Sequence, residues 1–506
     1  MTTQHNRRIL TLALLLSASS LLGASASAAE GEKPKKPKKP NIVFILADDL
    51  GYTDVACYGS KYYETPNIDR MAAEGTRFTS GQTCGPNCQP TRAALHSGQY
   101  SPRTGVYTVG GINRFDWSKR PLRPVDNIAQ LPLEKITIAD SLKKAGYATG
   151  MFGKWHLGNN GPHHPSQRGF DEAIVSEGKH FNIKTNPPTE VPEDEYLADF
   201  LTDRAVDFID RHQDEPFFLY LPHYGVHAPY QAKKDLIAKF RDKKAAGGHH
   251  DPTYAAMIAS VDESVGRVLA KLEELGLDDD TLVIFSSDNG GVGGYDDVGI
   301  TKKMGITDNE PLRGGKGTLY EGGVRVPYVF RWKGAVKPGQ TEATPINSVD
   351  LYPTLLELAG AEAPADYPLD GVSYAQLLKD GKPLEREALY WHFPGYLGAN
   401  GDQWRTTPAG AIRVGDWKLL EFFEDGRLEL YNLKDDIGEK KNLATAEPEK
   451  TRELHEKLKA WRQEINAPMP QANQVSADAA EPQKPAKKKG QGKGKGKRQG
   501  KRAKAA

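Results

Sequence analysis

Short apolar runs alternate with longer amphipathic segments through the first two thirds of the chain. We expect buried strands at 41–47, 147–152, 217–221 and 281–286. Apolar residues at helical spacing predict helices at 136–145, 197–211 and 254–275. Regular alternation of strand and helix predicts an α/β fold, in which helices sandwich a large, mostly parallel sheet.

The pattern changes near residue 385. Four short apolar runs follow, separated by tight turns such as Gly415-Asp416 and Asp425-Gly426, and they predict strands at 388–393, 411–414, 417–423 and 428–432. A helix is expected at 449–466. We therefore divide the body into a main domain, 41–384, and a smaller C-terminal antiparallel α+β subdomain, 385–469.

The two ends differ from the body. Arg7 and Arg8 precede an apolar run, 9–22, and an Ala-x-Ala site ends at Ala28. This pattern predicts a signal peptide, 1–28, and hence an exported protein, periplasmic or secreted. A basic, Pro-rich linker (29–40) follows, and 470–506 reads as a disordered basic tail. We expect no integral membrane span, because no run reaches membrane length.

Charge is distributed unevenly along the chain. The ends carry 18 of the 67 Lys and Arg residues but only two of the 66 Asp and Glu residues, which leaves 41–482 with a net charge of −15. An acidic body argues against a nucleic-acid-binding core. An anionic substrate would have to be met by a local basic pocket. For the tail two interpretations stand: contact with a polyanionic polymer, or a solvated segment without a specific partner.

Polar residues directly follow several of the predicted strands: Asp48, Asp49, Lys154, His156, His227, Asp288 and Asn289. Ligand sites of parallel sheets lie at the carboxyl ends of the strands, so we expect these side chains to meet. The carboxylate and amide oxygens suit Ca²⁺ or Mg²⁺ better than zinc. Taken alone, an Asp-Asp pair is more often a turn or a helix cap.

The segment Cys88-Gln89-Pro90-Thr91-Arg92 resembles the maturation motif of type I sulfatases, in which the cysteine is oxidised to Cα-formylglycine. The resemblance extends over 41–465. It includes, in the order of the family, segments 41–51, 65–69, 153–158, 169–171, 227–229, 287–290, 313–317 and 320–323. The chain is thus similar to bacterial exported arylsulfatases and glycan sulfatases of the alkaline-phosphatase-like superfamily. The resemblance implies a sulfuric ester hydrolase and a formylglycine-generating maturation enzyme as a partner.

The resemblance also implies a cation site. Asp48, Asp49, Asp288 and Asn289 would bind Ca²⁺, with Mg²⁺ the second choice, and residue 88 would complete the site after conversion of Cys88. Such a cation acts as a Lewis acid on a sulfate oxygen. A formylglycine hydrate carries two hydroxyls, one to attack sulfur and one to expel sulfate afterwards.

Further roles follow from the same resemblance. Arg92 would brace the nucleophile and the cation site. Lys154 and Lys316 would neutralise the charge that develops on the sulfuryl and leaving oxygens. His156 would orient the hydrate or take its proton, and His227 would protonate the leaving alkoxide.

Several alternatives remain open at this level. Gln89 and His96 depart from the usual motif without removing Cys88, Pro90 or Arg92. A Cys57–Cys84 disulfide is an option that the spacing does not decide. The rival functions are a formylglycine-dependent phosphonate monoester hydrolase or phosphodiesterase, and an inactive glycan-binding member.

The substrate is expected to be a sulfated carbohydrate or an aryl sulfate. Segments 106–131, 177–195, 292–311 and 396–408 are the least family-like and are the candidate specificity regions. They contain sugar-stacking and sulfate-reading residue types: Arg114, Trp117, Arg120, Arg123, Tyr295, Trp404 and Arg405. His163, His164, His223, His249 and His250 are expected in loops outside the shared motifs. His163 and His164 could reach the mouth of the site, although a solvated loop is the default, and His249 and His250 are expected in a Gly-flanked turn.

Overall fold

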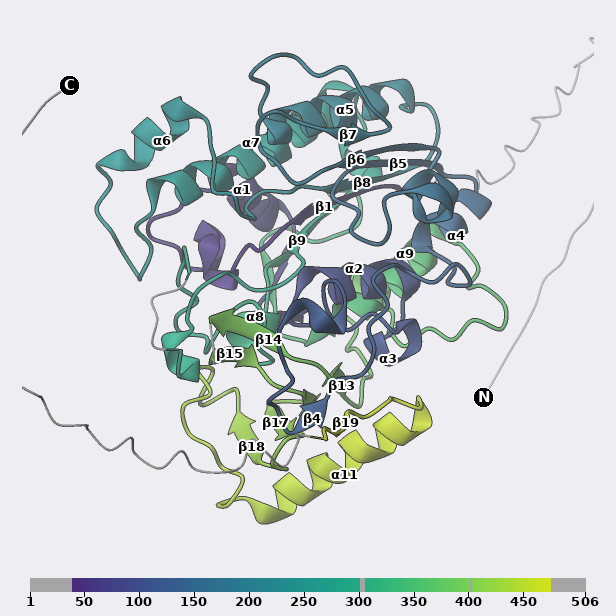
Figure 1. Ribbon diagram of the computed structural model, residues 1–506. Helices are drawn as coiled ribbons and strands as arrows, with labels where there is room; N and C mark the ends of the chain where they lie inside the picture. The colour runs from purple at the N-terminus through teal and green to yellow at the C-terminus, as the bar shows by residue number, and fades with distance from the viewer. Residues whose placement is uncertain (1–38, 301–304, 401–402, 475–506) are drawn as a thin grey trace, which may run out of the picture. The chain divides into compact units, whose positions relative to one another are not determined.

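The computed structural model describes residues 39–300, 305–400 and 403–474. The predicted signal peptide, most of the linker and most of the tail lie outside these residues. Within the described part, nine strands form one sheet in the order β11-β2-β10-β9-β1-β8-β5-β6-β7 (Figure 1). The strands are β1 (Asn41–Ala47), β2 (Thr76–Phe78), β5 (Ala148–Gly153), β6 (Glu172–Ser176), β7 (Thr185–Asn186), β8 (Phe217–Pro222), β9 (Thr281–Ser287), β10 (Tyr328–Arg331) and β11 (Gln340–Glu342).

The centre of the sheet is parallel. β1 pairs in parallel with both β8 and β9, and β5 pairs in parallel with β8 and β6. β10 runs antiparallel between β9 and β2, and β7 runs antiparallel to β6. The predicted mostly parallel sheet is confirmed, with antiparallel strands added toward both edges.

Helices cover both faces of this sheet. Val43 and Ile45 of β1 pack with α1 (Pro66–Glu74), α5 (Leu197–Arg211), α6 (Lys234–Arg241) and α7 (Pro252–Glu274). Ile42 and Phe44, which point the other way, pack with α2 (Cys88–Ser97), α4 (Ile138–Lys144), α9 (Leu351–Ala359) and α10 (Ala375–Asp380). Alternate side chains of one strand thus enter two cores, which explains the uninterrupted apolar run at 41–47.

The C-terminal region forms a separate antiparallel sheet, as predicted. Its order is β13-β16-β17-β18, and α11 (Pro448–Glu464) packs on it. The strands are β13 (Leu389–Phe393), β16 (Ala409–Val414), β17 (Trp417–Phe422) and β18 (Leu428–Asn432), and a hairpin of β14 (Leu397–Asn400) and β15 (Gln403–Thr406) precedes β16. Ala94 of α2 shares a hydrophobic cluster with this sheet, so α2 is buried from two sides.

The structure sharpens the boundary of the C-terminal region. β19 (Gln471–Ala472) pairs with β4 (Leu122–Arg123), so residues 470–474 belong to the described fold and not to a disordered tail. Among the helices of residues 39–300, 305–400 and 403–474, none combines the length and the hydropathy that a membrane-spanning helix requires.

Candidate active site

The carboxyl ends of neighbouring parallel strands bring the predicted polar residues together. Asp48 and Asp49 follow β1, Asp288 and Asn289 follow β9, and Lys154 follows β5. All but Lys154 are almost completely buried, and Lys154 is 9% exposed. The left-handed backbone at Asp49 (φ 67°) turns the chain sharply where β1 ends.

Cys88 is the first residue of α2 and is buried at its N-terminus. Free N–H groups and the helix dipole favour negative charge at this position. Burial raises the pKa of the Cys88 thiol above its usual value although Lys154 and Lys316 lie close enough to oppose the shift. The unmodified side chain is therefore a protonated thiol at neutral pH, and hence a weak nucleophile.

Arg92 lies one turn further along α2 and joins three segments of the site. Its Nε donates to Asp288 Oδ2 at 2.8 Å, and its Nη2 lies 2.7 Å from the same oxygen. Its Nη1 donates to the carbonyl of Lys154 at 2.5 Å. The guanidinium is completely buried, so these charge-assisted contacts fix α2 relative to the ends of β5 and β9.

Two lysines and a histidine surround the aspartate pair. Lys154 Nζ forms an ion pair with Asp48, and Lys316 Nζ forms one with Asp49. His227 Nε2 lies 3.7 Å from Asp49 Oδ2. Burial alone would raise the pKa of Asp48, but the nearby Lys154, His227 and Arg92 hold it well below its usual range. The pocket thus concentrates positive charge on an acidic protein.

The oxygen-rich centre of the site fits a hard cation. One ligand atom each from Asp48, Cys88 and Asp288 lies within 4.8 Å of the others, and the same holds for Asp48, Asp49 and His227. Asp48 Oδ1 and Asn289 Oδ1 are buried without a hydrogen-bond partner among the described residues. Because an unpaired buried oxygen is costly, these two atoms point to a cation that would satisfy both.

Lys316 reaches the site from a long loop. Asn309 is fully buried, and its Nδ2 lies within 3.2 Å of the carbonyl oxygens of Gly291, Gly293 and Gly314. The backbone N–H of Lys316 also donates to the carbonyl of Gly291. The side chain of Asn309 therefore joins the segment after Asn289 to the segment before Lys316. No sequence pattern around Asn309 predicted this contact.

The two predicted site histidines are held differently. Burial and the neighbouring Lys154 keep the pKa of His156 well below its usual value, so its imidazole is neutral. His227 Nδ1 contacts the carbonyl of Ala228 at 2.6 Å, which leaves Nε2 facing Asp49. The buried His180 contacts the His227 carbonyl at 2.8 Å and was not singled out from the sequence.

These residues open into a cavity of about 440 Å³. It is lined by Asn87, Cys88, Val109, Arg114, Phe115, Lys154, His156, Tyr224, His227, Lys316, Leu397, Gly398 and Arg405. Of the four candidate specificity regions, 106–131 and 396–408 contribute to the lining. The hydroxyl of Tyr295, in 292–311, donates to the carbonyl of Lys316, and His180, in 177–195, contacts the carbonyl of His227. Trp117 and Trp404 do not line this cavity.

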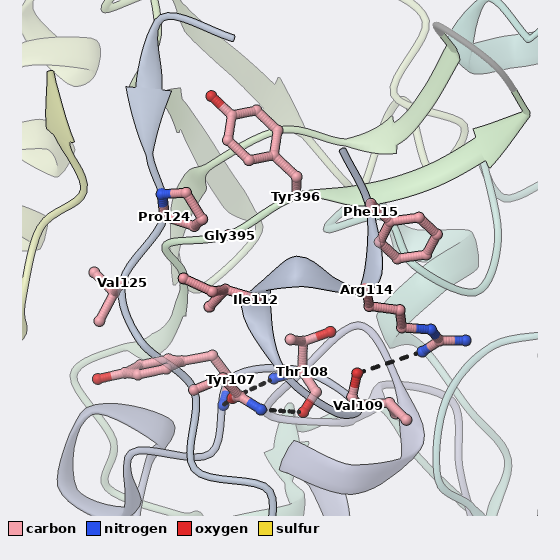
Figure 2. A pocket seen from close by; sticks show the side chains of 12 residues that line it. Tyr107, Thr108, Val109, Ile112, Arg114, Phe115, Pro124, Val125, Gly395 and Tyr396 are labelled. Atoms are coloured by element: carbon pink, nitrogen blue, oxygen red, sulfur yellow. Dashed lines mark hydrogen bonds between the residues drawn. The ribbon is translucent and has the colours of Figure 1, made fainter. Parts of the chain in front are cut away.

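The loop at 107–115 forms one wall. Figure 2 shows its other side, where Tyr107 and Ile112 line a smaller neighbouring cavity together with Pro124 and Tyr396. Arg114 extends away from that cavity, and its Nη1 lies 3.5 Å from the carbonyl of Val109. Arg114 therefore borders both cavities.

The structure decides the open question of the disulfide and shows how the histidines outside the site are packed. Cys57 and Cys84 are not joined by a disulfide: Cys57 packs in the α1–α7 core, whereas Cys84 packs between α2 and the C-terminal sheet. His249 follows the turn at Gly247-Gly248 as expected but is buried, stacked on Tyr63 with ring centroids 4.4 Å apart; His164 and His223, expected in loops, are buried as well. The glycine-rich sequence around His249 gave no indication of its packing on Tyr63.

The two departures from the family motif have structural explanations. Gln89 Nε2 donates to the carbonyl of Ala129 at 2.5 Å, which ties α2 to the loop beside the cavity. His96 is buried among the rings of Trp155 and Tyr220, and burial lowers its pKa to about 3. It is a neutral packing residue, and neither substitution disturbs Cys88 or Arg92.

Comparison with known families supports this picture. The family model described as Sulfatase matches residues 40–361, and the model described as N-sulphoglucosamine sulphohydrolase, C-terminal, matches residues 315–465. Together they span the main sheet, the site and the C-terminal sheet.

Individual relatives agree with the family models. A sulfatase from Formosa agariphila is 36% identical over 85% of this chain and 90% of its own length. N-acetylgalactosamine-6-sulfatase from Homo sapiens is 34% identical, covering 77% of this chain and 73% of its own. The crystal structure of Ps i-CgsB in complex with k-i-k-neocarrahexaose has a TM-score of 0.70 and 32% identity, covering 84% and 93% of the two chains. The chain therefore belongs to the sulfatase family, has its alkaline-phosphatase-like fold and is a sulfuric ester hydrolase.

Proposed function

We propose that this sulfatase hydrolyses sulfate esters of sulfated carbohydrates, through formylglycine made from Cys88 and with a bound Ca²⁺. The observation that carries the proposal is the convergence of Cys88, Lys154, Lys316 and two histidines on one cavity, above a buried group of oxygen ligands. Relatives named for sulfated sugars support the carbohydrate part of the proposal.

Asp48, Asp49, Asp288 and Asn289 would hold the cation, together with residue 88. Their hard oxygens, two of them without partners, match Ca²⁺ better than a thiophilic metal. When bound, the cation supplies Lewis acidity at a sulfate oxygen.

Residue 88 would attack the sulfur of the ester. Formylglycine hydrate would supply two hydroxyls on one carbon, one to attack and one whose ionisation later releases sulfate. The N-terminus of α2 lies directly under this position and stabilises the negative charge of the incoming sulfate. Arg92 keeps α2 seated against the ends of β5 and β9 during the reaction.

Lys154 and Lys316 would meet the charge that develops in the transition state. Both ammonium groups line the cavity beside Cys88, and both are anchored by an aspartate that fixes their position. Preorganised cations in a site shielded from water stabilise developing charge without a reorganisation cost. The sulfuryl oxygens and the leaving oxygen are the atoms that need this stabilisation.

His156 and His227 would move protons. The neutral imidazole of His156 lines the same cavity as residue 88 and would accept a hydrogen bond from its hydroxyl. His227 presents Nε2 to the cavity and would protonate the departing alkoxide. This step matters most for sugar sulfates, because an alkoxide is a poor leaving group.

A direct comparison of esters tests the proposal. We expect matured enzyme to hydrolyse p-nitrophenyl sulfate with a kcat/KM at least tenfold above that for p-nitrophenyl phenylphosphonate, and to release inorganic sulfate from sulfated polysaccharides. The phosphonate arm addresses the rival activity, since a phosphonate monoester hydrolase from Agrobacterium radiobacter shares the fold at 20% identity. A preference for the phosphonate would contradict the proposal.

A further inference from the structure

Four arginines in the candidate specificity regions differ in whether they have an acidic partner. Arg120 forms an ion pair with Glu424, and Arg123 lies 2.8 Å from Asp126. Arg114 and Arg405 line the Cys88 cavity, and among the described residues neither forms an ion pair with a carboxylate. The first two arginines are paired with carboxylates, so of these four the second pair carries positive charge that no carboxylate of the described residues compensates.

Arg405 is placed next to Lys316 by its surroundings. Its guanidinium lies over the ring of Tyr295, 4.8 Å from the centroid. The Tyr295 hydroxyl donates to the carbonyl of Lys316 at 2.9 Å. A Cβ added to Gly317 would lie 3.0 Å from Arg405 Cδ, so this glycine lets the arginine stem pass against the Lys316 loop. Arg405 is thus held beside the reaction centre from the C-terminal hairpin β14–β15.

The guanidinium of Arg405 is prepared for an anion. Its Nε is buried and has no hydrogen-bond partner among the described residues. A buried donor without an acceptor carries a desolvation cost that a bound anion would relieve. The planar guanidinium presents parallel N–H groups that match two oxygens of a sulfate or a carboxylate.

The groove on the far side of Arg405 supports the choice of this residue. Arg405 also lines that groove, together with Arg313 and Arg427. Both of those arginines contact Glu429, which compensates their charge. Arg405 lies between the Cys88 cavity and this groove. Of the three arginines that line the groove, it is the one without a carboxylate partner among the described residues.

We propose that Arg405 binds a second anionic group of the substrate, a sulfate or a carboxylate carried near the ester that is cleaved. Arg114, exposed on the loop wall of the same cavity, would contribute from 106–131. The proposal rests on the proposed function and deepens it: the preferred carbohydrate is at least doubly anionic, and hairpin β14–β15 selects it.

Calorimetry in a Cys88→Ala background tests this proposal, because it measures binding without turnover. Three sulfated disaccharides serve as probes: one with a single sulfate, one with a second sulfate, and one with a uronate carboxylate. We expect a compound with two anions to bind about tenfold or more tightly than the singly sulfated one. Adding Arg405→Gln should weaken its binding about 10- to 100-fold, and much less that of the single sulfate.

Control variants separate charge from fold. Arg405→Lys should retain part of the preference for the doubly anionic compound, since lysine keeps the positive charge but lacks the paired N–H groups of the guanidinium. Arg123→Gln, an arginine paired with Asp126 outside the cavity, should leave the preference unchanged. The proposal fails if neither second anion improves binding, or if Arg405→Gln retains the full preference. Hydrolysis of p-nitrophenyl sulfate by matured wild-type enzyme tests the proposed function separately.

Discussion

Replacing Cys88 by alanine is expected to lower sulfate ester turnover by about 10⁴-fold or more, the scale on which enzymes lose rate with their nucleophile. Apart from Cys88 the cavity is lined by two lysines, two histidines, two arginines, Asn87, Tyr224 and apolar residues, and no second cysteine and no serine or threonine lines it. The measurement is kcat with p-nitrophenyl sulfate, on wild type and variant made with the same maturation enzyme.

Cys57→Ala is the matched control. Cys57 is half-buried, packs against the core that contains α1 and α7 and does not line the cavity, so its loss should leave kcat within about twofold. Circular dichroism and melting temperature should show both variants folded. Turnover that survived in Cys88→Ala would mean that another group attacks sulfur.

Replacing Asp48 by asparagine is expected to remove the cation and with it about 10³-fold of kcat/KM, as a Lewis acid contributes several kcal/mol. Asp48 touches both Lys154 and Arg92 and carries an oxygen without a partner. The neutral amide keeps its shape and loses the charge, so a divalent ion is held far less tightly.

The cation claim has a readout besides activity. A ligand that binds only the folded state raises the melting temperature. Wild type, stripped with a chelator, should melt at a higher temperature when Ca²⁺ is added back, and Asp48→Asn should not respond. Asp214→Asn, at an exposed carboxylate on the surface, should respond like wild type. An equal response in Asp48→Asn would place the cation elsewhere.

Much of the fold follows from hydrophobic pattern. Buried parallel strands such as β1 and β9 are apolar on both faces and stand out in sequence, as do the amphipathic helices α5 and α7. β2 and β10 were not predicted. They are three and four residues long and contain Arg77 and Arg331, whose polar ends obscure a strand pattern. β10 is a strand because it pairs with β9, and this long-range pairing cannot be recognised from the local sequence.

The site also contains residues that the sequence pattern could place and residues that it could not. Asp48, Lys154 and Asp288 directly follow strands, so their meeting could be predicted from topology. Lys316 and Arg405 could not be placed by that rule, because tertiary contacts bring them in. Asn309 holds the loop of Lys316, and packing on Tyr295 holds Arg405. Only the resemblance to sulfatases singled out Lys316.

The mass of the peptide that contains Cys88 tests the central claim most directly. Conversion of the cysteine to formylglycine replaces –CH₂SH by –CHO and lowers the mass by about 18 Da. Protein made together with a formylglycine-generating enzyme should show this loss, in a fraction that rises with kcat across preparations. Fully active enzyme in which the peptide retains its thiol mass would contradict the account.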